Sequence, residues 1–361
     1  MNGIGNTRLA ELLAGDVPVA SVYFDQRSTA DAPLRWSTIA RGLSGQGAPA
    51  AVLDALAQQV VDVARGPGVL AAFARGDDLA FARTLPGASS VYLGRYGALP
   101  YLTPLLAWEQ QHPARVLAVL DRTGADISVY PAGSTDPLDT AVTGPDDEIE
   151  RNAPGGWSQG RYQHRAEDSW EHNSTAVAQV LARLLKHFDA RILLLAGDVR
   201  ALQYLDQHLP RWIHAGVTIR RLSGGRSEDG SAVRRAEQLV VRTQEIVGEQ
   251  NEALLAEYAD HVGTGGAAVQ GPDETFAALA AGRVRTLLLP DNAGEERAWF
   301  GPGPTDVALR PETLRQADIP AYDAPLEDVA VRAALLTDAD VRVFSNGQAP
   351  FGIAALCRFT P

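Results

Sequence analysis

The sequence contains one cysteine and one methionine in 361 residues, and it has no long hydrophobic run. A single cysteine excludes an internal disulfide framework. Cys357 stands in an apolar stretch, which predicts a buried strand thiol rather than a nucleophile. No apolar run is long enough to cross a bilayer, and residues 1–7 lack a basic and apolar signal pattern. These absences predict a soluble, cytoplasmic protein with no membrane partner.

Lysine is almost missing as well, since Lys186 is the only one in the chain. The cations are therefore nearly all arginines, whose planar guanidinium suits bidentate phosphate contacts, although genomic base composition also produces such a bias. The net charge of −12 argues against a general nucleic-acid-binding protein. Neither a Walker A loop nor a G-x-G-x-x-G motif is present, so we expect no nucleotide-binding loop and no cofactor.

The length predicts two or three domains of mixed α/β class. We expect an α+β domain over residues 1–112, with a strand at 17–24, helices at 33–43 and 50–65, and a hairpin of residues 69–74 and 79–82. Residues 42–49 between the helices predict a mobile, glycine-rich loop. An α/β domain with a protruding glycine loop follows over 113–231, and an α/β/α domain with a linking helix over 232–361.

The middle segment alternates strands and helices. A hairpin of residues 116–121 and 126–130 precedes a helix at 167–188, whose apolar residues recur at helical spacing. Residues 192–196 are continuously apolar, which is typical of a strand covered on both faces. In the third segment we expect a long helix at 232–261, a helix at 276–282, strands at 284–289, 341–344 and 353–359, and an exposed insertion at 301–304.

Residues 155–165 read Gly-Gly-Trp-Ser-Gln-Gly-Arg-Tyr-Gln-His-Arg and follow a loop rich in Pro, Asp and Glu. This pattern predicts a mobile polar tip that can reach an RNA-lined cavity. Two other interpretations stay open. Residues 156–160 match the G-x-S-x-G nucleophile elbow, but that motif needs a strand directly before the serine, and Pro154 argues against one. A plain surface loop is the third interpretation.

Two groups of polar residues could hold a metal ion. His164 and His172 lie near Glu167, Asp168 and Glu171, but their spacing matches no standard zinc pattern, and acids in a first helical turn complement the helix dipole. We therefore predict no metal there.

Asp121 and Asp198 form the second group, since each follows a predicted strand. As a pair they could bind a divalent ion, but an aspartate at a strand end more often caps a turn.

The ordered set of patterns resembles the class I release factor and Pelota family of eukaryotes and archaea, over nearly the whole chain. The resemblance is carried by residues 116–130, by Gly155-Gly156 followed by Arg161, Tyr162 and Arg165, and by residues 192–197, 271–289 and 352–359. Bacterial members of this superfamily are the most similar in pattern. They include Vms-type peptidyl-tRNA hydrolase-like proteins and Balon-type ribosome hibernation factors.

Two departures from the family pattern limit the function that the resemblance implies. Peptide release in the family needs a glutamine directly after the two glycines, but this chain has Trp157 there, and Gln159 is displaced along the tip. Residues 42–49 stand where the family reads stop codons and contain none of its Asn-Ile-Lys-Ser residues. We therefore expect neither stop-codon decoding nor release by the family mechanism.

The resemblance then implies a monomer that binds rRNA in the ribosomal A site, in hibernation or rescue, with a translation GTPase as a further partner. The residues expected to contact RNA are Gly155, Gly156, Trp157, Arg161, Tyr162, His164 and Arg165. The alternative is a peptidyl-tRNA hydrolase in which Gln159 is catalytic. A non-ribosomal stress protein that retains only the fold is the third possibility.

Overall fold

The structure is a computed structural model. It describes residues 11–13, 17–26, 31–62, 68–88, 92–121, 123–143, 159–226, 231–291, 294–345 and 352–360. Of these, the side chains of 61, 62, 92, 143, 159–172, 231 and 232 are outside the description.

Contacts divide the chain into two compact units, a middle unit of Gln111–Asn251 and a flanking unit that combines Ile4–Gln110 with Glu252–Pro361. The predicted mixed α/β class with several sheets is confirmed. The division into three domains at residues 112 and 231 stays a prediction.

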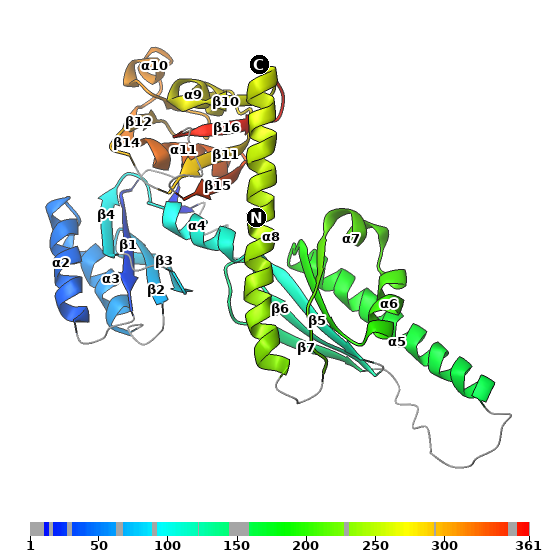
Figure 1. The fold of residues 1–361 in the computed structure, drawn as a ribbon. Helices are drawn as coiled ribbons and strands as arrows, with labels where there is room; N and C mark the ends of the chain where they lie inside the picture. The colour runs from blue at the N-terminus through cyan, green and yellow to red at the C-terminus, as the bar shows by residue number, and fades with distance from the viewer. Residues whose placement is uncertain are drawn as a thin grey trace. The chain divides into compact units, whose positions relative to one another are not determined.

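The middle unit is built on a five-stranded sheet in the order β7-β6-β5-β8-β9 (Figure 1). Its strands are β5 (Arg115–Asp121), β6 (Gly124–Tyr130), β7 (Leu138–Thr143), β8 (Ile192–Gly197) and β9 (Thr218–Arg221). The first three form an antiparallel meander, whereas β8 pairs in parallel with both β5 and β9. The predicted hairpin and the predicted strand at 192–196 are thereby confirmed.

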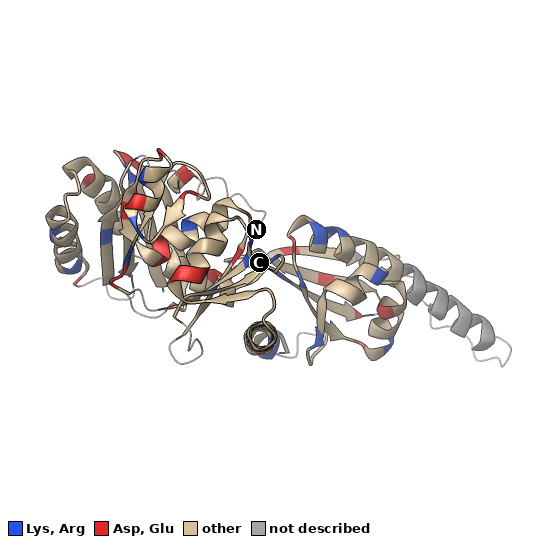
Figure 2. Ribbon diagram, turned by 90° about the horizontal axis from the view of Figure 1, so that it is seen from above, with Lys and Arg blue, Asp and Glu red and all other residues tan. Residues whose placement is uncertain are grey.

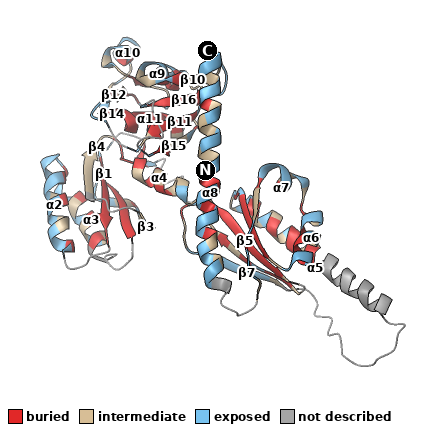
Figure 3. Ribbon diagram, in the orientation of Figure 1, coloured by how far each residue is buried: buried red, intermediate tan, exposed pale blue. Residues whose placement is uncertain are grey.

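Helices cover both faces of this sheet. Helices α5 (Gln159–His187), α6 (Val199–His208) and α7 (Arg211–Gly216) pack on one face. Leu239 and Ile246 of α8 (Ser231–Thr264) pack on the other. Because β8 lies between these layers, almost every residue of it is buried, which accounts for its continuous apolar sequence (Figure 3).

The end of β8 demands a glycine. Gly197 has a φ of 121°, and a Cβ at this position would lie 1.9 Å from the carbonyl oxygen of Leu120 on β5. The next residue, Asp198, donates its backbone N–H to that same oxygen at 2.9 Å. The close approach of the two strand ends therefore leaves no room for any side chain.

The flanking unit begins with a four-stranded antiparallel sheet in the order β3-β2-β1-β4. Its strands are β1 (Val19–Asp25), β2 (Gly68–Arg75), β3 (Asp78–Pro86) and β4 (Tyr92–Gly97). Helices α2 (Ala32–Gly45) and α3 (Ala50–Asp62) cover one face, while α4 (Thr103–Gln111) contributes to the apolar cluster on the other. The predicted strand, helices and hairpin of this segment are confirmed.

The loop expected at residues 42–49 is half helix, because α2 continues to Gly45. Gly47 then ends the helix with a φ of 92°, and the N–H of Ala48 donates to the carbonyl of Leu43 at 3.0 Å. Gln46 is tied to β4, since its Oε1 accepts from the N–H of Tyr96 at 2.8 Å. The prediction of an eight-residue mobile loop was wrong, because the glycines there cap a helix.

The C-terminal part of the flanking unit has two sheets, in the orders β10-β16-β11-β15 and β13-β12-β14. The strands are β10 (Ala268–Gln270), β11 (Val284–Pro290), β12 (Arg297–Phe300), β13 (Val307–Ala308), β14 (Tyr322–Pro325), β15 (Asp340–Phe344) and β16 (Ala354–Cys357). The remaining helices are α9 (Gly271–Ala280), α10 (Pro311–Gln316) and α11 (Leu326–Leu336).

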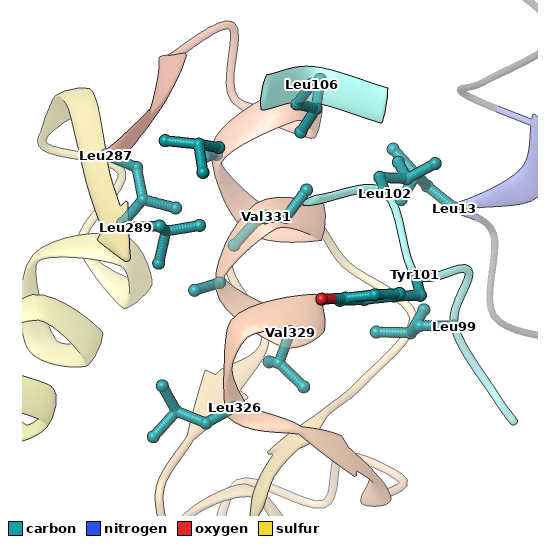
Figure 4. Packing of buried hydrophobic residues seen from close by; sticks show 14 of the residues in the cluster. Leu13, Leu99, Tyr101, Leu102, Leu106, Leu287, Leu289, Leu326, Val329 and Val331 are labelled. Carbon is teal, nitrogen blue, oxygen red and sulfur yellow. The ribbon is translucent and has the colours of Figure 1, made fainter. Parts of the chain in front are cut away.

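Helices sandwich the larger of these two sheets, as the predicted α/β/α arrangement requires. Tyr258 of α8 packs on one face against Leu288 and Phe344. Val329 and Val331 of α11 belong to the cluster on the other face, together with Leu287 and Leu289 of β11 (Figure 4). The same cluster includes Leu102 and other residues of the N-terminal segment, so one core joins the two ends of the chain.

Residues 301–304 are exposed only at Pro302 and Pro304, whereas the sequence suggested an exposed insertion throughout. Gly301 is buried, and Arg332 of α11 donates to the carbonyls of Pro302 and Gly303 at 2.9 and 3.0 Å. Arg332 also donates to the carbonyl of Leu13 at 2.9 Å and is only 1% exposed. The glycines and prolines of this stretch therefore shape a backbone that receives a buried guanidinium.

An ion pair connects β4 to α11 inside the flanking unit. Arg95 donates from Nη1 to Oδ2 of Asp328 at 3.2 Å, and its guanidinium lies 4.0 Å from the centre of the Tyr101 ring. Asp328 is 2% exposed, and burial raises its pKa to about 7 although Arg95 acts to lower it. Its Oδ1 has no hydrogen-bond partner among the described residues.

We predict that Gly197→Ala destabilises the protein by at least about 2 kcal/mol, because a Cβ would strain a positive φ and overlap a carbonyl oxygen. The matched control is Gly248→Ala in α8, where a Cβ meets nothing within 4 Å. That change should stabilise the chain by roughly 0.5–1 kcal/mol. Unfolding of both full-length variants, followed by circular dichroism, measures the difference. Equal stabilities of the two variants would contradict the conclusion that position 197 has no room for a Cβ.

A second prediction concerns Asp328. Its folded pKa of about 7 lies above the unfolded value of about 3.9, so the folded state binds this proton more tightly. The contribution of Asp328 to stability is therefore lost as pH rises from about 4 to 7. Relative to wild type, Asp328→Asn should gain thermal stability across that range, whereas the exposed-site control Asp340→Asn should not. A gain that shrinks as pH rises would refute the raised pKa.

Candidate functional site

The amino-terminal part of α5 is the element nearest to the predicted tip. Within this 29-residue helix, Val177, Leu181 and Leu185 anchor the carboxyl-terminal half on the sheet. Residues 159–172 add about 20 Å of helix before that half. Figure 1 shows this part of α5 continuing past the end of the five-stranded sheet. The middle unit thus presents one long helix end next to the tip sequence.

The predicted RNA-contacting residues fall into two groups. Gly155, Gly156 and Trp157 lie outside the described residues. The other predicted positions belong to the first two turns of α5, with only their backbone described, and they are Gln159, Arg161, Tyr162, His164 and Arg165. Positions 161 and 165 are four residues apart, so they share one face of the helix.

The start of α5 corrects the sequence analysis, which expected a helix only from residue 167. The helix begins at Gln159, eight residues earlier. Residues 159–167 contain Gln, Arg, Ala and Glu, which favour helix. Gly160 stands in the first turn, where backbone N–H groups have no intrahelical partner in any case. Half of the predicted tip is therefore helix rather than loop.

The candidate metal ligands of this region cannot be tested geometrically. His164, Glu167, Asp168, Glu171 and His172 all lie where only the backbone of α5 is described. Ser158, the nucleophile of the elbow interpretation, lies outside the described residues. Among the side chains that the structure does describe, no group of three His, Cys, Asp or Glu could hold a metal ion.

A charged cluster lies at the carboxyl end of β5. Arg226 binds Asp126 with two nitrogens at 2.7 and 2.9 Å, and donates to Oδ1 of Asp121 at 2.8 Å. Burial alone would raise the pKa of Asp121, but hydrogen bonds from Thr123 and Arg226 hold it below its usual value. Hydrogen bonding to Asp126 and Asp121 raises the pKa of Arg226. The cluster joins the β5–β6 turn to Arg226 and, with one arginine and two aspartates, keeps one net negative charge.

Asp121 and Asp198 each accept backbone N–H groups, as the turn-capping interpretation predicts. Oδ1 of Asp121 accepts the N–H groups of Thr123 and Gly124 at 2.8 and 3.1 Å. Asp198 caps α6, since its Oδ1 accepts from the N–H of Arg200 at 2.7 Å. Sequence reasoning missed Arg226. Its partner Asp121 is 105 residues away, and no local pattern could have linked them.

Cys357 is buried in β16, and burial raises the pKa of its thiol. The prediction of a buried strand thiol is confirmed, and the group has little thiolate character for nucleophilic chemistry. Within the described part of the chain, every helix is too short or too polar to span a membrane.

Comparison with solved structures finds only distant likenesses. The archaeal translation termination factor aRF1 has 15% sequence identity and a TM-score of 0.26, with 98% of each chain covered. A model of ribosome-bound archaeal Pelota and ABCE1 has 14% identity and a TM-score of 0.42, with 99% and 94% covered. Dom34 of Saccharomyces cerevisiae, a translation termination-like factor, has 14% identity and a TM-score of 0.40, with 68% and 63% covered.

No TM-score among these three reaches 0.5, so the family assignment rests on sequence comparison. The chain is 32% identical over 378 residues to the uncharacterized protein Rv2629 of Mycobacterium tuberculosis strain H37Rv, with 98% of this chain and 96% of that protein covered. The same identity and coverage hold for protein MT2704 of strain CDC 1551 / Oshkosh. The model of bacterial archaeo-eukaryotic release factor family 2 matches residues 114–264, which include the whole sheet of the middle unit. The chain belongs to the bacterial archaeo-eukaryotic release factor family 2.

Proposed function

We propose that this protein is a cytoplasmic, ribosome-associated factor that occupies the A site in hibernation or rescue, without decoding stop codons. The observation that carries the proposal is the middle unit. Its long helix α5 directly follows the Gly155-Gly156 sequence, in a chain of the release factor family. A helix anchored on a rigid sheet by its carboxyl-terminal half can deliver its other end into a confined cavity.

RNA contact at that end would use phosphate groups and exposed bases. Arginines at positions 161 and 165 share a helix face and suit bidentate phosphate binding. Trp157 and Tyr162 supply aromatic rings on which bases can stack. Such contacts recognise shape and charge rather than base sequence. They suit a protein that waits on the ribosome instead of reading a codon.

The absence of decoding has a structural rationale. The region that corresponds to the family's codon-reading loop is a capped helix end, and Gln46 holds it to β4. It lacks the Asn-Ile-Lys-Ser residues of that loop. A short, tethered connection of this kind has little reach, which supports the proposed lack of codon reading.

A hydrolase is the second candidate, and the observation that favours it is Gln159 at the first position of α5. There it follows the two glycines at a distance of only a few residues. Trp157 argues against this reading, because an indole offers one N–H donor and much apolar bulk where a water molecule would have to be ordered.

We predict that replacing Arg161 and Arg165 together with alanine weakens co-sedimentation with ribosomes. Log affinity falls as log salt rises, and each lost phosphate contact makes this slope less steep by about one. The slope of the double variant should therefore be less steep by about two. The measurement is ribosome pelleting across a salt series with the full-length protein.

The matched control is Arg310→Ala with Arg315→Ala, which removes two exposed charges from α10 and its flank. This variant should bind like wild type. If the folded Arg161 and Arg165 variant binds equally well at every salt concentration, the amino-terminal part of α5 does not contact ribosomal RNA.

We also predict no peptidyl-tRNA hydrolysis by the wild-type protein on stalled ribosomes. The assay compares wild type with Gln159→Ala and Ser158→Ala, which separate a water-ordering glutamine from a serine nucleophile. Ribosome binding without release supports an A-site occupant. Release that is abolished by Gln159→Ala alone would establish the hydrolase instead, and release abolished by Ser158→Ala alone would point to the nucleophile elbow.

A further inference from the structure

Basic residues outnumber acidic ones over the segment that runs from the second half of α5 to the loop after β9. Residues 173–226 contain eight Lys or Arg and three Asp, and no Glu, which gives +5 in a chain whose net charge is −12. Figure 2 shows the contrast with the flanking unit, where α9 and α11 carry Asp and Glu. Charge of one sign is therefore segregated by element rather than spread evenly.

Three of these cations are neutralised within the fold. Arg226 binds Asp121 and Asp126, and Arg220 donates to Glu249 at 2.6 Å. Arg191 donates to Asp189 at 3.1 Å, but both side chains are more than half exposed, so water screens the pair strongly. The other five form no ion pair with any residue that the structure describes, and they are Arg183, Lys186, Arg200, Arg211 and Arg221.

A lysine of α5 lies over the tryptophan of α7, and two arginines lie on or near the same helix. Nζ of Lys186, in the last turn of α5, lies 5.2 Å from the ring centre of Trp212 on α7. Arg211 precedes this tryptophan on the same helix. Arg191 reaches the end of α7, where a Cβ on Gly216 would lie 3.7 Å from its Nη1. We name this set, Lys186, Arg191, Arg211 and Trp212, the α5–α7 surface.

We propose that the α5–α7 surface binds the phosphate backbone of RNA. Lys186 and Arg211 are exposed, and the half-buried Trp212 lies on the same helix as Arg211, with Lys186 of α5 over its ring. Exposed cations that pair with no described acid match the closely spaced negative charges of an RNA backbone. At physiological salt, charges are screened over about 8 Å, so the acidic flanking unit does not cancel a local basic surface.

The inference goes beyond the proposed function, because it assigns RNA binding to a second surface that needs no ribosome. Lys186 stands 27 residues after Gln159 on the same helix, which corresponds to about 40 Å. The two ends of α5 would then contact RNA at two separated points. Such bivalent attachment raises overall affinity without requiring strong contacts at either end.

The test uses the full-length protein and a short fluorescent RNA duplex, with binding followed by anisotropy across a salt series. Replacing Lys186 and Arg211 together with alanine should weaken binding by about tenfold at low salt and lower the salt slope by about two. Lys186→Arg, which keeps the charge, should bind like wild type. The Arg310→Ala, Arg315→Ala control should also be unaffected.

Polyglutamate serves as the competing acidic polypeptide. Displacement by RNA duplex but not by polyglutamate supports the inference, whereas equal displacement would assign the surface to an acidic protein partner. A folded alanine double variant that binds RNA as tightly as wild type would also overturn it. Naked RNA separates this question from the A-site proposal, which could fail in the ribosome assay while duplex binding persists.

Discussion

Arg332 lies inside the flanking unit with 1% of its surface exposed, and it donates only to backbone carbonyls of Leu13, Pro302 and Gly303. Burial lowers the pKa of this guanidinium, and Asp306 acts in the opposite direction. An unsolvated charge in a protein interior is very costly, so these carbonyls must stay where they are. The conformation of residues 301–304, and the attachment of the chain near Leu13, follow from that requirement. The guanidinium also lies over the ring of Phe300, with its carbon 5.0 Å from the ring centre.

The same unit uses a second polar device to join the two ends of the chain. Gln110 donates from its side-chain amide to the carbonyl of Val343 at 3.1 Å, and its Oε1 accepts from the N–H of that residue at 2.9 Å. The amide thereby pairs with β15 as a neighbouring strand would, at an edge of the larger sheet. Together with the Arg95–Asp328 ion pair, this amide adds polar contacts of defined geometry to the apolar core that joins the N-terminal and C-terminal segments of the flanking unit.

Sequence patterns predicted the elements whose residues repeat regularly. The continuous apolar stretch of β8 and the helical spacing of apolar residues in α5 predict these two elements, and the sequence also predicts the long α8. The small β13-β12-β14 sheet was missed, because strands of two to four residues show no alternation. The carboxylate partners of Arg226 lie 100 and 105 residues away, and the carbonyl partners of Arg332 lie 29 to 319 residues away, beyond any local signal. Of the predicted site, the structure describes the backbone from Gln159 onward, and the roles of these residues stay predictions.

The interleaving of the two units has a consequence for synthesis of the protein. Residues 111–251 form a continuous stretch, so the middle unit is complete as soon as that stretch has left the ribosomal tunnel. The N-terminal sheet is still incompletely packed at that point. Its face with Tyr23, Val69 and Phe73 packs in a core that includes α11 and β11, which are made after the middle unit. At ordinary translation rates this apolar face stays uncovered for on the order of ten seconds or more in every round of synthesis. Exposed apolar surface of this kind is what chaperones bind.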